Sequence, residues 1–441
     1  MPEIEEKRTS IKENFFYGLG ILGSSTIGFL VNNWLLYFYL PPDDDPLIPV
    51  ALSGFVILAG RIIASLITPW IGYLSDNARF RWGRRLPFMF VAVIPLIVSF
   101  IFLWAPPFHS QPLWNLLYIF VIMIVYRIAS VVYMIPYQAL LPEIATQERH
   151  RVRISAWQSG FLLAGMLVGG LAGLLIDEIG YLLSALVYAG IALLFLFLPI
   201  LVLKKRPQQR LDSNDKINFP ESLLITLKNQ AFVIFIIVWS LYLMTSTLSQ
   251  SFAPFLVTEV CLLNQADTTS FYIPAILVSL VMYPLIVKFS SLIGKRKVYI
   301  ISLLASAFVF PTTMLIGSWF PIPLKTQCIS WAVLQAVALS GTVVLSSTFV
   351  AETIDYDETI TGQRRGGVYF AMMKFLDQLL TGIASLLLPL FLLLGRSQNS
   401  QQGPLGVRMI GLVAGALMFI GFLIFLRYPS DLERADHIRT G

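Results

Sequence analysis

KKRPQQRLDSNDKINFPES, residues 204–222, is the one long polar interruption in this chain, and it decides how the rest is organised. Apolar residues make up 56% of the 441 residues and charged residues 13%, whereas a soluble protein has about 25% charged residues. Such a chain needs lipid as its solvent. Six apolar runs precede the interruption and six follow it, so we divide the chain into residues 1–203, a linker over 204–222, and residues 223–441.

Each of the twelve runs is about as long as the 17 to 25 residues that a helix needs to cross a bilayer. The predicted spans are 15–40, 48–74, 88–105, 113–141, 155–176, 181–203, 231–258, 268–293, 298–319, 327–351, 367–394 and 406–427. The sequence therefore predicts an all-α polytopic membrane protein with twelve transmembrane helices in two six-helix halves, the linker being cytoplasmic.

The positions of the positive charges predict the orientation of the chain. When both termini are placed in the cytoplasm, the outer loops and span ends hold only Lys325, Arg396 and Arg408. This agrees with the positive-inside rule. The polar start MPEIEEKRTSIKEN leads into a first span too long for a signal peptide, so we expect no cleavage. We predict a multi-pass protein of the plasma (inner) membrane, a monomer, whose partners are lipid and a small-molecule solute and not nucleic acid.

Motifs for catalysis and for pores are missing from the sequence. There is no H-E-x-x-H, no G-x-S-x-G and no phosphate loop, and His109, His150 and His437 fall in predicted loops. A channel needs a filter loop or rings of like charge, and neither is present. We therefore expect no enzyme, no cofactor and no metal site, and we predict transport by alternating access.

Three segments narrow this prediction: GYLSDNARFRWGRRLPF at 72–88, IPYQALLPE at 135–143 and ETIDYDETITGQRRGG at 352–367. Their order and spacing resemble the glycoside–pentoside–hexuronide (melibiose-type) cation symporters of the major facilitator superfamily. The resemblance implies the major-facilitator fold and symporter-like secondary active transport of a small polar solute, a sugar or glycoside. Two alternatives stay open: transport of a carboxylated or phosphorylated organic anion, and a non-transporting membrane receptor or scaffold.

The second span departs from the pattern of that family. Melibiose-type members resemble RIWDxxxDP there, with two aspartates that help to bind the coupling cation, whereas residues 61–69 read RIIASLITP. Ala64 and Thr68 replace the two carboxylates, and an alkali cation prefers hard, charged oxygen ligands. We therefore favour a proton over sodium as the coupling ion, with Asp377 as a protonatable group. Gln138 stands where the family has an aromatic sugar platform.

Several charged residues fall within predicted spans, where a charge is costly and usually faces a cavity with a partner. Lys374 and Asp377 are three residues apart on one helix and can pair. Arg61 and Arg127 have no evident carboxylate in neighbouring spans. Either an anionic group of the substrate supplies their counter-charge, or both are structural braces that donate hydrogen bonds to carbonyls or to the side chains of Asn32, Asn33 or Gln138. We expect all four to border one water-filled cavity near the midplane. The predicted substrate and cavity residues are Asn32, Asn33, Arg61, Arg127, Gln138, Lys374, Asp377 and Gln378.

The acidic end of the tenth span and the basic loop after the second span suggest a gate on the cytoplasmic side. Acidic groups of one half facing basic groups of the other would form a latch that breaks when the protein opens inward. The predicted gating residues are Asp76, Arg84, Arg85, Glu352, Asp355 and Arg364. The alternative is that these are solvated loop charges, because exposed ion pairs are worth under about 1 kcal/mol each.

Overall fold

The computed structural model describes residues 11–78, 80, 82–108, 111–144, 148–203, 229–317, 321–361, 366–394 and 404–429. These residues are almost entirely helical and contain no strand. The chain packs into two compact units. The N-terminal unit comprises Met1–Phe38 and Ala59–Asn214, and the C-terminal unit comprises Tyr39–Leu58 and Asp215–Gly441. The predicted linker over 204–222 lies outside the described residues.

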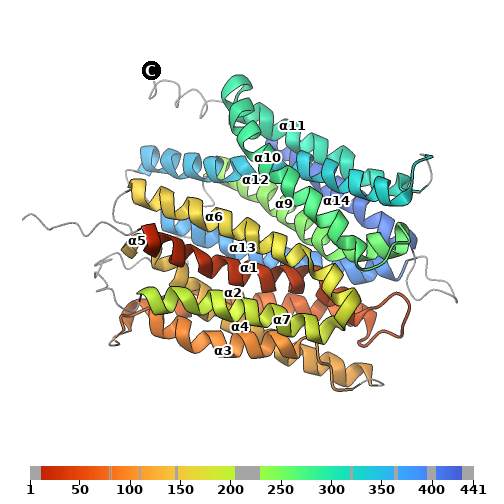
Figure 1. Ribbon diagram of the computed structural model, residues 1–441. Coiled ribbons are helices and arrows are strands. Elements are labelled where there is room, and N and C mark those ends of the chain that lie inside the picture. Colours follow the sequence, from red (N-terminus) through yellow and green to blue (C-terminus); the bar gives the residue numbers. More distant parts are fainter. Residues whose placement is uncertain are drawn as a thin grey trace, which may run out of the picture. The chain divides into compact units, whose positions relative to one another are not determined.

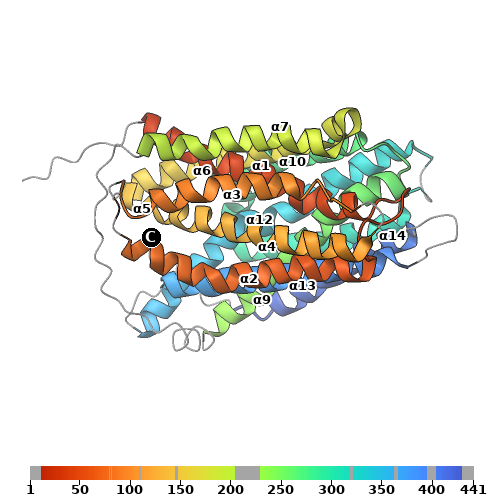
Figure 2. The same ribbon diagram turned by 90° about the horizontal axis from the view of Figure 1, so that it is seen from below.

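The first group of helices starts near the N-terminus and ends before the linker. Its members are α1 (Ile11–Tyr39), α2 (Val50–Asn77), α3 (Leu86–Phe102), α4 (Pro112–Ala139), the single turn α5 (Leu141–Ile144), α6 (Glu148–Gly170) and α7 (Ala172–Leu203). Proline occupies the first turn of α3 and of α4, where its missing N–H costs nothing. Figures 1 and 2 show α3 running beside α4 and α7, and it packs against both.

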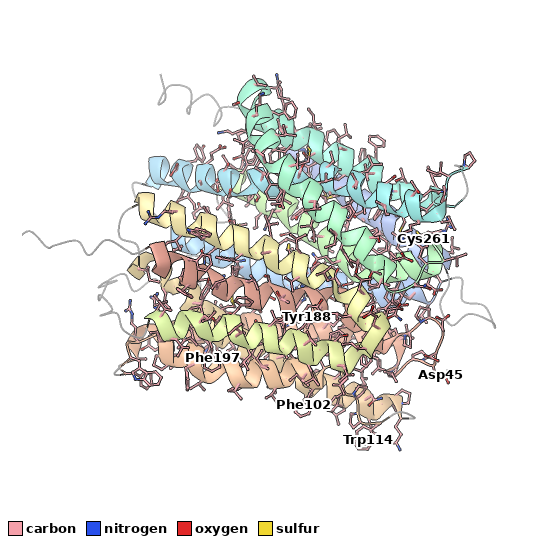
Figure 3. All side chains as sticks on the ribbon, in the orientation of Figure 1. Asp45, Phe102, Trp114, Tyr188, Phe197 and Cys261 are labelled. Atoms are coloured by element: carbon pink, nitrogen blue, oxygen red, sulfur yellow. The ribbon has the colours of Figure 1, made fainter. Side chains whose placement is uncertain are left out.

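The boundary predicted between the fifth and sixth spans lies inside α7. Gly180 has φ 78° and ψ 171°, a left-handed conformation that favours glycine, and it interrupts the helix. The fifth span is therefore α6 together with the first turns of α7, and the sixth span follows Gly180. On α7, Tyr188 (Figure 3) donates its hydroxyl to the Val168 carbonyl oxygen at 2.9 Å, which ties the sixth span to the fifth.

The second group of helices forms the C-terminal unit together with the first turns of α2. Its members are α9 (Gln230–Phe255), the π-helical turn η1 (Leu256–Val260), α10 (Asp267–Ile293), α11 (Lys295–Val309), the 3-10 turn η2 (Phe310–Leu315), α12 (Leu324–Thr361), α13 (Gly366–Leu392) and α14 (Pro404–Phe425). Asn229 caps α9 by accepting a hydrogen bond from the Phe232 N–H at 3.1 Å. Gly294 alone separates α10 from α11, with φ 93°.

The helices confirm the predicted fold class. Ten of the described segments are long and apolar enough to cross a membrane, and Leu86–Phe102 is a shorter apolar helix. The remaining long helix is α6, which begins with the charged residues ERHRVR before its apolar part. The protein is an all-α membrane protein, and the twelve long helices of its described residues match the twelve predicted spans. One boundary differs in a useful way: α12 continues to Thr361 instead of ending at 351, so Glu352 and Asp355 lie on a helix.

Candidate functional site

Arg61 on α2 and Arg127 on α4 lie next to each other within the N-terminal unit. Both side chains are half-buried, and the charge of Arg127 acts on Arg61. Gly60 makes this possible: a Cβ at that position would lie 3.4 Å from Arg127 Cγ and 2.9 Å from Met123 Cγ. The stem of Arg127 therefore runs across the glycine that precedes Arg61. Two guanidinium groups held together repel each other, and an anion between them would relieve that repulsion.

The surroundings of Arg127 leave it short of hydrogen-bond partners. Its guanidinium carbon lies 5.7 Å from the centroid of the neighbouring Tyr126 ring, within the range of a cation–π contact. Its Nε is buried, and in the described part of the chain no acceptor bonds to it. A bond from Arg127 to Asn32, Asn33 or Gln138, the structural alternative raised by the sequence, does not occur among the described residues.

The other predicted cavity residues of this unit differ in their surroundings. Asn33 is fully buried and donates from Nδ2 to the Phe29 carbonyl oxygen at 2.7 Å, so this amide is used within its own helix. Asn32 is half-buried and Gln138 is exposed. On α2, Ala64 is buried, and Thr68 donates its hydroxyl to the Ala64 carbonyl oxygen at 2.8 Å. The positions of the family's two carboxylates thus hold a methyl group and a hydroxyl bonded to the backbone.

The C-terminal unit contains the second charged group, on α13. Lys374 Nζ lies 3.9 Å from Asp377 Oδ2, so the two residues pair as their spacing predicts. Trp239 on α9 donates from Nε1 to Asp377 Oδ1 at 3.1 Å. Gln378 is half-buried, and its Oε1 is buried without a hydrogen-bond partner in the described residues. That Arg61, Arg127 and the Lys374–Asp377 pair share one cavity stays a prediction, because they belong to different units.

Sequence reasoning missed Trp239 as a partner of Asp377. The two residues are 138 positions apart, and no local spacing connects them. A signal was nevertheless present, because Trp residues of membrane proteins gather at the two bilayer interfaces. Trp239 lies well inside the span Gln230–Val260, where an indole N–H needs an acceptor.

The structure describes the side chains of four of the six predicted gating residues. Glu352 on α12 forms an ion pair with Lys295, the first residue of α11 and a member of the same unit. Asp355 is exposed, Arg84 is half-buried and Arg85 is buried. The side chain of Asp76 and all of Arg364 lie outside the described residues. The latch between halves therefore stays a prediction, and the ion pair of Glu352 with Lys295 lies within one unit.

Each of the two units contains membrane-spanning helices with charged residues inside the spans. A family model described as "MFS/sugar transport protein" matches residues 16–431. That match covers nearly the whole chain, so the protein belongs to this family, and it is a secondary transporter of small solutes with the major-facilitator fold.

Several proteins resemble this chain. The Isoprimeverose transporter of Lactiplantibacillus pentosus is 24% identical over 87% of this chain and 80% of its own length. The Glucuronide carrier protein homolog of Escherichia coli is 22% identical over 97% of this chain and 92% of its own length. A symporter of Synechocystis, sll1374, is 32% identical, but the match covers only 34% of this chain and 28% of that protein.

Solved structures show the same fold. The crystal structure of a D-xylose-proton symporter superposes with a TM-score of 0.69, covering 96% of this chain and 98% of the other at 15% sequence identity. At that identity the likeness concerns the arrangement of the helices alone.

Proposed function

We propose that this protein moves a sugar or glycoside across the plasma (inner) membrane by alternating access, as a monomer with no catalytic activity of its own. The observation that carries this proposal is the family match over residues 16–431. Two relatives that align over most of the chain support it, since one is named for isoprimeverose and the other for glucuronides. Uptake of labelled sugars into proteoliposomes that contain the purified protein tests it.

The charges at the two ends of the C-terminal unit support cytoplasmic termini. Asp45 and Cys261 lie at one end of this unit (Figure 3), where residues 43–45, Glu259 and Asp267 are acidic. From this end α10 runs to Ile293 at the other end, where 295–297 read KRK. Under the positive-inside rule the basic end faces the cytoplasm. α14 returns to that end, since Arg296 Nη2 donates to the Leu426 carbonyl oxygen at 2.9 Å.

A second candidate substrate class is an acidic one, either a sugar acid or another organic anion with a carboxylate or phosphate. The specific observation in its favour is Arg127, a half-buried guanidinium in a membrane span with a second arginine beside it. Guanidinium groups bind carboxylates and phosphates in a bidentate manner, and such charge-assisted bonds are about twice as strong as neutral ones. A neutral sugar would leave this positive charge without compensation.

Replacement of Arg127 separates the two substrate classes. If the substrate is acidic, an acidic sugar competes for uptake more strongly than its neutral analogue, and Arg127→Gln reduces that preference by about tenfold, the equivalent of about 1.4 kcal/mol. The measurement is inhibition of labelled-sugar uptake by glucuronate and by glucose over a range of concentrations. Arg153→Gln, an exposed arginine on α6, is the matched control and should leave the preference unchanged. If the wild type and Arg127→Gln show the same preference, the acidic substrate class is rejected and the neutral sugar is the substrate class that stands.

Coupling to sodium is not expected. The α2 positions that carry carboxylates in melibiose-type symporters hold Ala64 and Thr68, and the Thr68 hydroxyl is bonded to the backbone. One neutral oxygen does not replace the charge that an alkali cation needs in order to lose its water. Uptake measured at fixed pH should therefore be the same in sodium and in potassium buffers of equal ionic strength. A sodium-dependent rise in the rate would contradict this prediction.

A further inference from the structure

Asp377 is a carboxylate inside a membrane span, on α13 within Met372–Leu392. Only 15% of its side-chain surface is exposed. An ionised carboxylate at such a depth is costly, and residues of this kind in membrane proteins mark pathways for ions or protons. The arrangement of its neighbours shows how well its charge is compensated.

The two carboxylate oxygens have different partners. Oδ1 accepts a hydrogen bond from the Trp239 indole N–H at 3.1 Å, and this donor is neutral. Oδ2 faces Lys374 Nζ at 3.9 Å, which is longer than a hydrogen bond, and 68% of the Lys374 side-chain surface is exposed. The negative charge is thus held by one neutral donor and by one loosely placed cation. A proton can replace the cation without breaking a close ion pair.

Among the described residues of the C-terminal unit, the elements packed against α13 place no charge other than Lys374 beside Asp377. α9 contributes Trp239 and the Tyr242 ring, whose centroid lies 5.0 Å from that of Trp239. Among the described residues of the C-terminal unit, Lys374 is the one charged group that acts on Asp377. On α14, Arg408 is bonded to the Met314 carbonyl oxygen, away from this site.

The other neighbours of α13 are α12 and the first part of α2, and their described charged residues lie elsewhere. The described charged residues of α12 lie toward its two ends, where Lys325 pairs with Asp267 and Glu352 pairs with Lys295. The α2 segment that reaches α13 does so at Gly54 and Ser385, and residues 50–58, VALSGFVIL, carry no charge. Within the described part of this unit, Lys374 and Trp239 are therefore the groups that respond to a change in the charge of Asp377.

We propose that Asp377 binds and releases the coupling proton, with Trp239 and Lys374 as the partners that sense its charge. Protonation converts the carboxylate to a neutral acid, which no longer attracts Lys374 and accepts a weaker hydrogen bond from Trp239. Release of the proton restores both interactions. Because Trp239 is on α9 and Asp377 on α13, the protonation state changes the link between these two helices. This inference deepens the proposed transport function and rests on it for the coupling step.

A first experiment needs no substrate. Infrared difference spectra of the purified protein between acidic and neutral pH should contain a carbonyl band of a protonated carboxylic acid that is absent in Asp377→Asn. Asp355→Asn, an exposed aspartate on α12, is the matched control, because its loss should remove only the band of a solvated acid. Trp239→Phe should keep the Asp377 band but shift its frequency, since the indole bond is lost. Identical spectra of the wild type and Asp377→Asn would overturn the proposal.

A second experiment measures coupling in proteoliposomes with an imposed pH gradient. The wild type should accumulate labelled sugar, whereas Asp377→Asn should only equilibrate it, with an accumulation ratio of about one, and should retain exchange of labelled for unlabelled sugar. Accumulation by Asp377→Asn at the wild-type level would overturn the assignment, and so would loss of exchange together with accumulation. If the wild type moves no sugar at all, the proposed function fails, while the infrared titration still decides the protonation of Asp377.

Discussion

Gly165→Val is expected to lower the melting temperature of the purified protein by about 6 °C or more. Gly165 lies on α6 where this helix meets α1, and a Cβ there would lie 2.8 Å from the Leu22 carbonyl oxygen and would also collide with Ser25 Oγ. The Ser25 hydroxyl can rotate, but the Leu22 carbonyl belongs to the backbone, so α1 must move. Overpacking lowers the free energy of unfolding by about 1 to 3 kcal/mol, and by more when the backbone must shift. Each kcal/mol lowers the melting temperature by about 2 °C in a protein of this size.

The same helix offers a matched control for this prediction. Gly160 is also on α6, and a Cβ there would meet nothing within 4 Å. Because valine is a better helix former than glycine, Gly160→Val should leave the melting temperature unchanged or raise it slightly. The measurement is a thermal unfolding scan in the same detergent. Equal melting temperatures of the two variants would show that α1 and α6 are not in close contact.

Tyr137→Phe is expected to destabilise the protein by about 1–3 kcal/mol, the cost of leaving a buried polar group without its partner. Tyr137 on α4 and Tyr17 on α1 are fully buried, their rings stack at 4.6 Å, and each hydroxyl donates to the backbone carbonyl of the other at 2.7 Å and 2.6 Å respectively. Gln158 Nε2 also donates to the Tyr137 hydroxyl, at 3.2 Å. The phenylalanine ring keeps the stacking but loses all bonds to this hydroxyl.

Tyr118→Phe is the control for the Tyr137 prediction. Tyr118 is on the same helix and also donates to a backbone carbonyl, that of Phe102 at 2.9 Å, but this bond is exposed. Its loss should cost less than about 1 kcal/mol, since the freed groups find other partners. Both variants are compared by thermal unfolding. A larger loss for Tyr118→Phe than for Tyr137→Phe would contradict the structural role of the bonds between α1 and α4.

The fold was predictable because it depends on the lengths of apolar runs. A bilayer demands about 20 apolar residues from every span, and each of the twelve runs meets that demand without reference to the rest of the chain. Boundaries were harder to predict when they depended on one residue or on packing. Gly180 breaks α7 through a positive φ, and α12 extends to Thr361 because nothing in its sequence stops it before that point.

The candidate site was predictable where it is local. Lys374 and Asp377 are one helical turn apart, so their spacing alone indicated the pair. Contacts between distant helices could not be predicted in this way. The Trp239 bond to Asp377 and the approach of Arg127 to Gly60 depend on how α9 packs on α13 and α2 on α4. For the same reason the sequence did not indicate the ion pair between Glu352 and Lys295.

The most direct test of the proposed function is uptake of labelled sugars by proteoliposomes that contain the purified protein. The panel should include neutral sugars and glycosides, sugar acids and unrelated organic anions, and empty liposomes set the background. We predict saturable uptake of at least one sugar or glycoside, blocked by an excess of the same unlabelled compound. Protein whose unfolding transition is intact, but which moves no member of the panel faster than empty liposomes, would contradict the transport function and favour a membrane receptor or scaffold.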